Sequence, residues 1–160
     1  MKRFLVTLIA TYFLINLSAA NKAVYNIMDY GAIADTTILS TNAIQKAIDE
    51  CAKNGGGVVW VPSGNYLTTS VVLRSNVNLH LDAGSALYAS RRVSDYKNHK
   101  IKVGASDAEA VEVILIALNE NNISVTGTGK LHCQAVREQF RREPQLAITC
   151  LLYTSPSPRD

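Results

Sequence analysis

The amino-acid sequence predicts an all-β fold of short strands, arranged either as a solenoid of stacked parallel strands or as a β-sandwich. Residues 55–90 contain short runs of β-branched and aromatic residues separated by tight turns, with no helix between them. Residues 77–82 alternate between apolar and polar side chains, which is the period of a strand with one buried face. The brevity of the runs and their Asn- and Gly-containing connections favour the solenoid, because sandwiches use longer strands joined as hairpins.

The first 20 residues have the pattern of a secretory signal peptide. Lys2 and Arg3 precede an apolar run over residues 4–15, and small residues follow at 18–20, so we expect cleavage after Ala20. A membrane anchor is the alternative, but the run is shorter than the roughly 20 residues that a span needs. No second apolar segment of that length follows. We therefore expect a secreted or periplasmic protein that has no membrane contact once the signal is removed.

Charge and cysteine content exclude several classes of protein. The formal net charge is +3, and Lys2 and Arg3 supply two of these charges, so the mature chain is close to neutral and is not expected to bind nucleic acid. The three cysteines leave at least one unpaired. Cys51 lies on an apolar helical face and is expected to be a buried small hydrophobic residue. No Cys-x-x-C motif and no Cys/His cluster with zinc spacing is present, so we expect no metal and no cofactor.

One amphipathic helix is expected before the run of strands. Residues 25–30 are expected to form an opening strand, and residues 32–39 a loop. Thr41 or Asn42 offers an N-cap, with Gln45 as the capping-box partner of Asn42. Apolar residues then recur every three to four positions over 42–53, and Asn54-Gly55 ends the helix. This helix is expected to cap the open end of the strand stack, since an uncovered end would expose backbone groups and apolar side chains.

Short strands and turns fill the remainder of the chain to residue 133. Strands are expected at residues 58–61, 66–69, 71–73, 77–82, 86–89, 111–118, 123–126 and 130–133. Residues 91–110 form a long connection, with a brief strand expected at 101–103. This connection is basic, and its pattern favours a solvated loop, the alternative being attraction of an anionic polymer to a nearby cleft. Its basic residues are Arg91, Arg92, Lys97, His99, Lys100 and Lys102.

Three segments resemble pectin-degrading right-handed β-helix enzymes. The first comprises Tyr30-Gly31-Ala32, the helix and residues 55–66 (GGGVVWVPSGNY), and the second and third are residues 73–87 and 122–129 (NISVTGTG). The last two resemble the polygalacturonase-like glycoside hydrolases of family 28 in particular. The resemblance implies that residues 21–133 are the N-terminal, incomplete part of a right-handed parallel β-helix with an N-terminal capping helix. It also implies an enzyme that hydrolyses galacturonan or rhamnogalacturonan with inversion, and an anionic plant-type polysaccharide as partner.

The catalytic signatures of that family do not occur in this chain. Asn-x-Asp, Asp-Asp, Gly-His-Gly and Arg-x-Lys are all absent, so no catalytic residue is nominated and the fragment itself is expected to be inactive. Asp82 is expected to be a turn residue. His80 alternates with core positions and is expected to face solvent or a neighbouring turn, His99 lies in the basic connection, and His132 has no partner carboxylate nearby in sequence. A polysaccharide lyase, a tailspike-like depolymerase and a non-catalytic glycan-binding β-helix are the alternatives.

The last part of the chain departs from the family pattern. Residues 131–135 (LHCQA) lack the Asp and Gly residues expected there, and residues 134–160 lose strand periodicity. We expect 134–160 to lie outside the family domain, and 150–160 to be the translation of sequencing-adaptor DNA appended to a truncated record.

Overall fold

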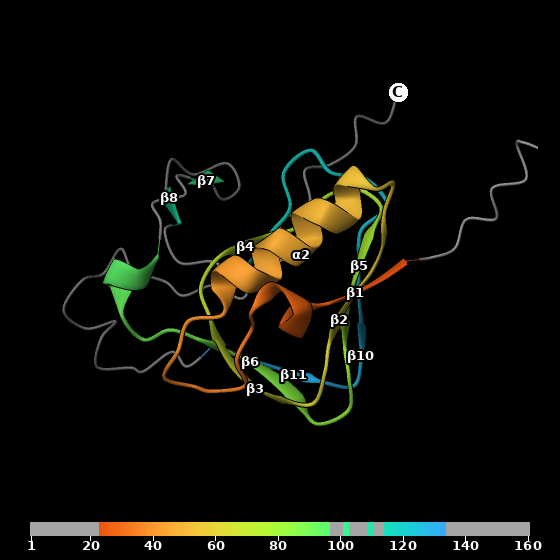
Figure 1. Cartoon of the computed structure of the whole chain (residues 1–160). Coiled ribbons are helices and arrows are strands. Elements are labelled where there is room, and N and C mark those ends of the chain that lie inside the picture. The colour runs from red at the N-terminus through yellow and green to blue at the C-terminus, as the bar shows by residue number, and fades with distance from the viewer. Residues whose placement is uncertain (1–22, 97–100, 103–108, 111–113, 134–160) are drawn as a thin grey trace, which may run out of the picture.

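The computed structural model describes residues 23–96, 101–102, 109–110 and 114–133, and these residues form a parallel β-helix (Figure 1). The chain winds in coils whose strands fall into three sheets, and the strand pairs within these sheets are all parallel. Crossovers between parallel strands are almost always right-handed. The solenoid prediction is confirmed, and the sandwich alternative, which requires antiparallel hairpins, is wrong.

The three sheets are built from strands that are distant in sequence. The first contains, in spatial order, β1 (Ala23–Asn26), β2 (Gly57–Val61), β5 (Val77–Leu81) and β10 (Ser124–Gly127). The second contains β3 (Gly64–Thr68), β6 (Ser85–Ala89) and β11 (Lys130–His132). The third pairs β4 (Val71–Val72) with β9 (Leu115–Ile116), and β7 (Ile101–Lys102) pairs antiparallel with β8 (Glu109–Ala110) outside the coils.

The core consists of inward side chains that stack from coil to coil. Val59 on β2 is in register with Leu79 on β5, and Tyr66 on β3 is in register with Leu87 on β6. All four side chains are fully buried. The alternation of residues 77–82 therefore predicted the buried face correctly. The next inward position of the first sheet, Val125 on β10, is 36% exposed, because among the described residues no strand lies beyond β10.

Helix α2 (Thr41–Lys53) lies against one end of the coils, as the amphipathic pattern predicted (Figure 1). The capping-box prediction is wrong: the N-cap is Ser40, which makes no side-chain cap hydrogen bond to the helix. Its Oγ instead exchanges hydrogen bonds with the backbone of Ile33. The Gln45 side chain turns away from the helix N-terminus and pairs with Val72, accepting from its N–H at 2.8 Å and donating to its carbonyl at 3.0 Å. The outer edge of β4 presents both an N–H and a carbonyl to the Gln45 amide. A capping box would offer this side chain only one backbone N–H.

The N-terminal end of the solenoid is closed differently on each sheet. Strand β1 pairs with β2 on the first sheet. On the second, Leu39 forms a parallel bridge with Leu67, and the Ser40 N–H donates to the Leu67 carbonyl at 2.8 Å. On the third, Gln45 caps β4, and Thr41 Oγ1 accepts the Thr69 N–H at 2.9 Å. Together these contacts satisfy edge groups that would otherwise be open to strand addition.

Two other predicted elements differ from the structure. The opening strand does not extend over residues 25–30: β1 ends at Asn26, and a 3₁₀ helix, η1 (Ile27–Tyr30), follows. Asn26 ends the strand because its side chain accepts the Met28 N–H, and Gly31 closes the turn at φ +91°. Strand 111–118 is reduced to the two residues of β9, and residues 111–113 lie outside the described part.

The predicted Asn turns are confirmed. Asn76 and Asn122 occupy equivalent corners of successive coils at φ +63° and +55°, and Asn122 Nδ2 donates to Asn76 Oδ1 at 2.9 Å. Asn tolerates this left-handed conformation better than most residues. The coils approach closely at this corner: a Cβ on Gly56 would lie 2.3 Å from the Asn76 carbonyl oxygen.

The connection between β6 and β9 spans residues 90–114, whereas residues 69–70 suffice between β3 and β4. It contains a 3₁₀ helix, η2 (Val93–Asp95), and the β7–β8 pair. The brief strand expected at 101–103 corresponds to β7. In the described part of the chain, no helix is long and apolar enough to cross a membrane. Cys51 is buried and free, as expected. The predicted signal peptide and the 134–160 tail lie outside the described residues.

Candidate functional site

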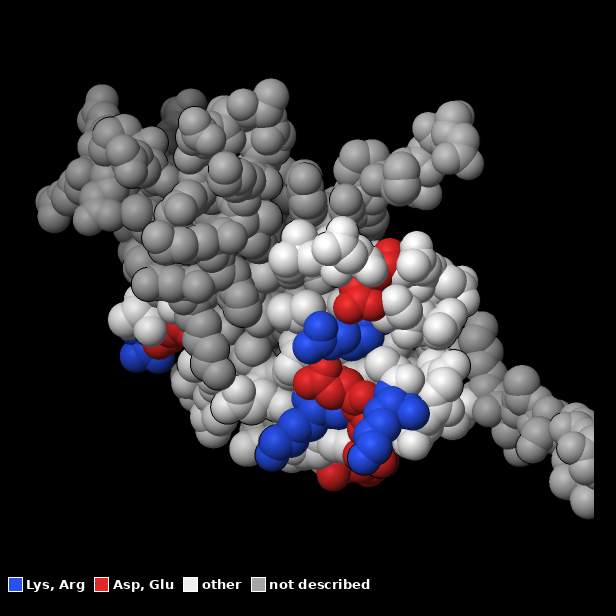
Figure 2. Space-filling view, turned by 90° about the horizontal axis from the view of Figure 1, so that it is seen from above, with Lys and Arg blue, Asp and Glu red and all other residues white. Residues whose placement is uncertain are grey.

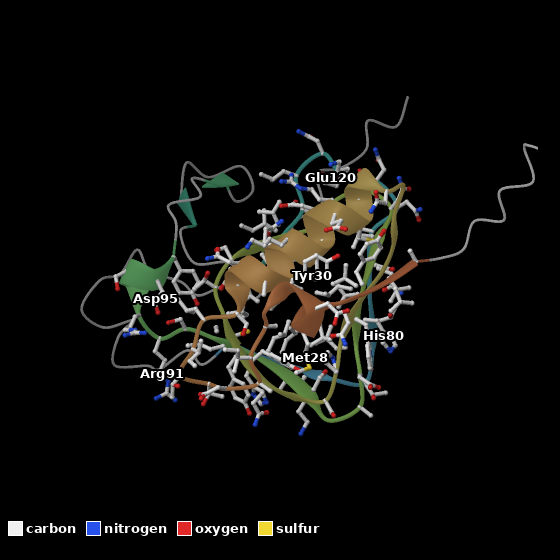
Figure 3. All side chains as sticks on the ribbon, in the orientation of Figure 1. Met28, Tyr30, His80, Arg91, Asp95 and Glu120 are labelled. Atoms are coloured by element: carbon white, nitrogen blue, oxygen red, sulfur yellow. The ribbon has the colours of Figure 1, made fainter. Side chains whose placement is uncertain are left out.

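A hollow lies on the outer side of the second sheet, and we call it the arginine cleft. It has a volume of about 630 Å³ and opens between the loop before α2 and the turn after β6. Arg91 and Asp95 mark this side of the molecule in Figure 3, well separated from Glu120 at the far end of α2. The cleft is lined by Thr36, Thr37, Leu67, Tyr88, Ser90, Arg91 and Arg92.

A stacked pair of rings supports the cleft. Tyr88 on β6 is in register with His132 on β11, and both side chains point outward from the sheet. Their ring centroids are 4.6 Å apart and the planes differ by 9°. Leu67 is the in-register neighbour of Tyr88 on the other side. The Tyr88 ring is therefore held between neighbours, and its edge and hydroxyl are the parts presented to the cleft.

The turn after β6 is fixed by hydrogen bonds around Ser90. The Ser90 hydroxyl donates to Asp95 Oδ2 and accepts the Arg92 N–H at 3.2 Å. Tyr96 Oη donates to the Ser90 carbonyl at 2.9 Å. Arg92 Nε contacts Asp95 Oδ2 at 3.2 Å, while the Arg92 side chain stays 68% exposed. Nε thus anchors the guanidinium to Asp95, and most of the Arg92 side chain remains exposed to solvent.

The opposite wall is fixed by Asp35. The Thr37 N–H and Oγ1 both donate to Asp35 Oδ1, each at 2.7 Å. These hydrogen bonds, that from the hydroxyl first, lower the pKa of Asp35 below its usual value. The Thr36 hydroxyl has no hydrogen-bond partner among the described residues.

A second hollow of about 300 Å³ lies between α2 and β4, and most of its polar groups are already paired. Gln45 is bonded to Val72, and Thr41 to Thr69. Ser70 Oγ is buried and has no partner among the described residues. Few free donors therefore remain for a ligand here.

The charged cluster at the far end of α2 stabilises the fold rather than forming a site. Arg74 contacts Asp49 at 3.0 Å and Glu120 at 3.6 Å, joining the helix to the turns of two coils. Glu120 accepts from the N–H and hydroxyl of Ser75, and these bonds together with Arg74 lower its pKa, the Ser75 hydroxyl having the largest effect. Figure 2 shows acidic and basic side chains intermingled on this face, so it has no patch of a single sign.

The residues considered in the sequence are dispersed over the structure. Asp82 is a turn residue as predicted: its Oδ1 accepts the Ala83 N–H at 2.8 Å and its carbonyl accepts from Ser85. His80 lies on the outer face of the first sheet, with Nδ1 2.9 Å from Thr126 Oγ1 (Figure 3). His99 lies outside the described residues. No cluster of His, Cys, Asp or Glu suited to a metal ion occurs in the part of the chain that the structure describes.

Sequence reasoning missed the Tyr88–His132 pair and the position of the arginines. The two rings are 44 positions apart because the long connection separates their coils. Only the register of β6 with β11, which the sequence does not reveal, brings them together. Arg91 and Arg92 were assigned to a loop favoured as solvated, and they line the arginine cleft.

Comparison with known proteins identifies similar chains among polysaccharide-degrading enzymes. Residues 24–132 match the family described as rhamnogalacturonase A/epimerase, pectate lyase-like. The exo-poly-α-D-galacturonosidase of Dickeya chrysanthemi is 36% identical over 107 residues, which cover 67% of this chain and 17% of the relative.

Two solved structures agree with this match. The family 28 exopolygalacturonase of Yersinia enterocolitica superposes with a TM-score of 0.59 at 32% identity, covering 70% of this chain and 21% of that one. The hyperthermoactive exopolygalacturonase of Thermotoga maritima gives a TM-score of 0.59 at 29% identity, covering 72% and 26%. The chain thus spans about a sixth to a quarter of the length of these three proteins.

Proposed function

The chain belongs to the rhamnogalacturonase A/epimerase, pectate lyase-like family, and on this premise we propose that its protein is a glycoside hydrolase acting on pectin-type polysaccharides. The match over residues 24–132, with polygalacturonases among both the sequence relatives and the solved structures, is the observation that carries the proposal. The substrates we propose are galacturonan or rhamnogalacturonan, which are anionic polymers.

Inverting hydrolysis is the mechanism we propose. It uses two carboxyl groups about 6.5–9.5 Å apart, one to protonate the leaving oxygen and one to activate water. Several described carboxylates have structural roles: Asp35 binds Thr37, Asp82 binds Ala83, and Asp95 binds Ser90. Asp49 and Glu120 both bind Arg74. We therefore propose that the catalytic acids come from residues other than these, and that the described coils are the scaffold beside them.

A secreted or periplasmic location is also part of the proposal. It is supported by the basic, apolar and small-residue pattern of residues 1–20. N-terminal sequencing of the mature protein tests it, and a first residue of Asn21 is the expected result. Retention of Met1 in the exported protein would contradict it.

Product analysis tests the proposed reaction. The protein carrying this chain is incubated with polygalacturonate and with rhamnogalacturonan, and reducing ends are measured. We expect reducing ends to be released without the ultraviolet absorbance of an unsaturated sugar. Absorbance that rises with cleavage would identify a lyase, and binding without cleavage would identify a non-catalytic glycan-binding β-helix. Either result would reject hydrolysis.

A further inference from the structure

We propose that the arginine cleft is a binding site for one carboxylate-bearing sugar unit, separate from the bond that is cleaved. The class of ligand rests on the proposed function. The existence and polarity of the site rest on the geometry of the cleft itself.

The cleft presents hydrogen-bond donors to an open space. Arg92 is held through Nε by Asp95, and its terminal nitrogens have no partner among the described residues. Two parallel N–H groups of a guanidinium match the two oxygens of a carboxylate. Asp95 contacts Nε and does not line the cleft, so the terminal nitrogens of Arg92 remain the donors available to an anion there.

The donors are already positioned, which lowers the cost of ordering them on binding. The Ser90 hydrogen bonds fix the turn that carries Arg92, and the His132 stack fixes the Tyr88 ring. Affinity gained from a preorganised site comes largely from such avoided ordering. By contrast, most polar groups that line the hollow between α2 and β4 are hydrogen-bonded to other protein groups.

The shape of the cleft suits a single polar sugar ring. Tyr88 offers its edge and hydroxyl rather than an open ring face, since His132 covers one face and Leu67 adjoins the other side. A sugar in the cleft can therefore contact the Tyr88 hydroxyl and the Thr36 hydroxyl, which has no hydrogen-bond partner in the described part of the chain. Its carboxylate then lies at Arg92, with Arg91 also on the rim.

Binding of a defined oligosaccharide tests the site. Tri-galacturonate and its neutral methyl ester are titrated into the 160-residue chain by calorimetry at low salt. We expect the acid to bind and Arg92→Gln to weaken it about tenfold, the range for loss of a hydrogen bond to a charged group. Arg92→Lys should be intermediate, since it keeps the charge and loses the planar fork. Tyr88→Phe should weaken binding severalfold while leaving the rings stacked.

Lys46→Gln is the matched control, because it removes the same charge from the exposed face of α2. It should leave the affinity unchanged. Equal weakening by Lys46→Gln and Arg92→Gln, equal binding of the methyl ester, or no binding of the acid to the wild type would overturn the proposal. Circular dichroism of each variant confirms that it is folded. Failure of the proposed function gives a different result: the protein still binds the acid at the cleft but does not cleave polygalacturonate.

Discussion

The contact between Gln45 and Val72 predicts a measurable loss of stability when the amide is removed. Gln45→Leu keeps a helix-forming side chain of similar length but deletes two hydrogen bonds to the edge of β4. Each neutral hydrogen bond contributes about 1 kcal/mol, and each backbone group left unsatisfied in a buried position costs about 1–3 kcal/mol. Because Gln45 is only half-buried, water reaches part of this edge. We therefore expect a loss of about 2 kcal/mol.

Thermal unfolding followed by circular dichroism measures this loss. For a folded domain of about 100 residues, a loss of about 2 kcal/mol lowers Tm by roughly 8–16 °C. Lys46→Leu is the control: it places the same residue at the next, exposed position of the helix and should change stability by no more than about 0.5 kcal/mol. A Gln45→Leu variant with a Tm within 2–3 °C (roughly 0.5 kcal/mol) of the wild type would refute the role of the amide as a substitute strand partner.

Gln45→Glu separates the donor from the acceptor. A charged Glu still accepts the Val72 N–H, but it cannot donate to the Val72 carbonyl and it lies beside Asp49. Both effects favour the neutral form, so the folded-state pKa of the new carboxyl is raised above its unfolded value of about 4.3. The stabilising contribution of the protonated form is then present below pH ~4.3 and lost as pH rises through the folded pKa. The stability gap to the wild type should therefore narrow on acidification, and a gap that is constant with pH would contradict this reasoning.

Three further predictions concern the coils. Gly127→Ala should destabilise the chain by more than about 3 kcal/mol, because its Cβ would lie 1.8 Å from the Leu81 carbonyl oxygen at φ +99°. Gly55→Ala, at φ +94° with nothing within 4 Å, should cost only about 1 kcal/mol, and equal losses in urea unfolding would disprove the steric argument. Glu120→Gln should make the free energy of unfolding less sensitive to acid. The pKa of Glu120 is lowered in the folded protein, so its stabilising contribution is present above its ordinary pKa of 4.5 and is lost as pH falls through the folded pKa. An unchanged dependence of stability on pH would count against its bonds to Ser75 and Arg74. Leu79→Ala should cost about 2–5 kcal/mol in the same unfolding assay, whereas a loss below 1 kcal/mol would mean that the stacked core is not tightly packed.

The sequence predicted the coils because the patterns that specify their buried faces lie within short segments of the chain. The alternation over residues 77–82 and the apolar face of α2 each fix a buried side without knowledge of distant contacts. Prediction from the sequence failed at Gln45 and at Asn26, where a side chain had a choice of backbone partners. The Gln45 side chain bonds to the edge of β4 and not to the helix N-terminus. The Asn26 side chain accepts the Met28 N–H, and β1 therefore ends at Asn26.

The candidate site was less predictable than the fold for a physical reason. The arginine cleft joins residues 36–37, 67, 88 and 90–92, which meet only when successive coils are in register. Register across the 90–114 connection depends on how β9, β10 and β11 return to their sheets. The identity of Arg92 could be read from the sequence, but its position beside Tyr88 and opposite Thr36 could not.

The corner between the second and third sheets tolerates a large change in length. Residues 69–70 form it in one coil and residues 90–114 in the next, yet Val71–Leu115 and Val72–Ile116 remain paired. Closing the longer segment costs only about 2 kcal/mol more chain entropy, since that cost grows with the logarithm of length. New segments can therefore be grafted at this corner without disturbing the scaffold. Because residues 90–92 of this corner line the arginine cleft, a change in the length of the corner would reshape the rim of that cleft.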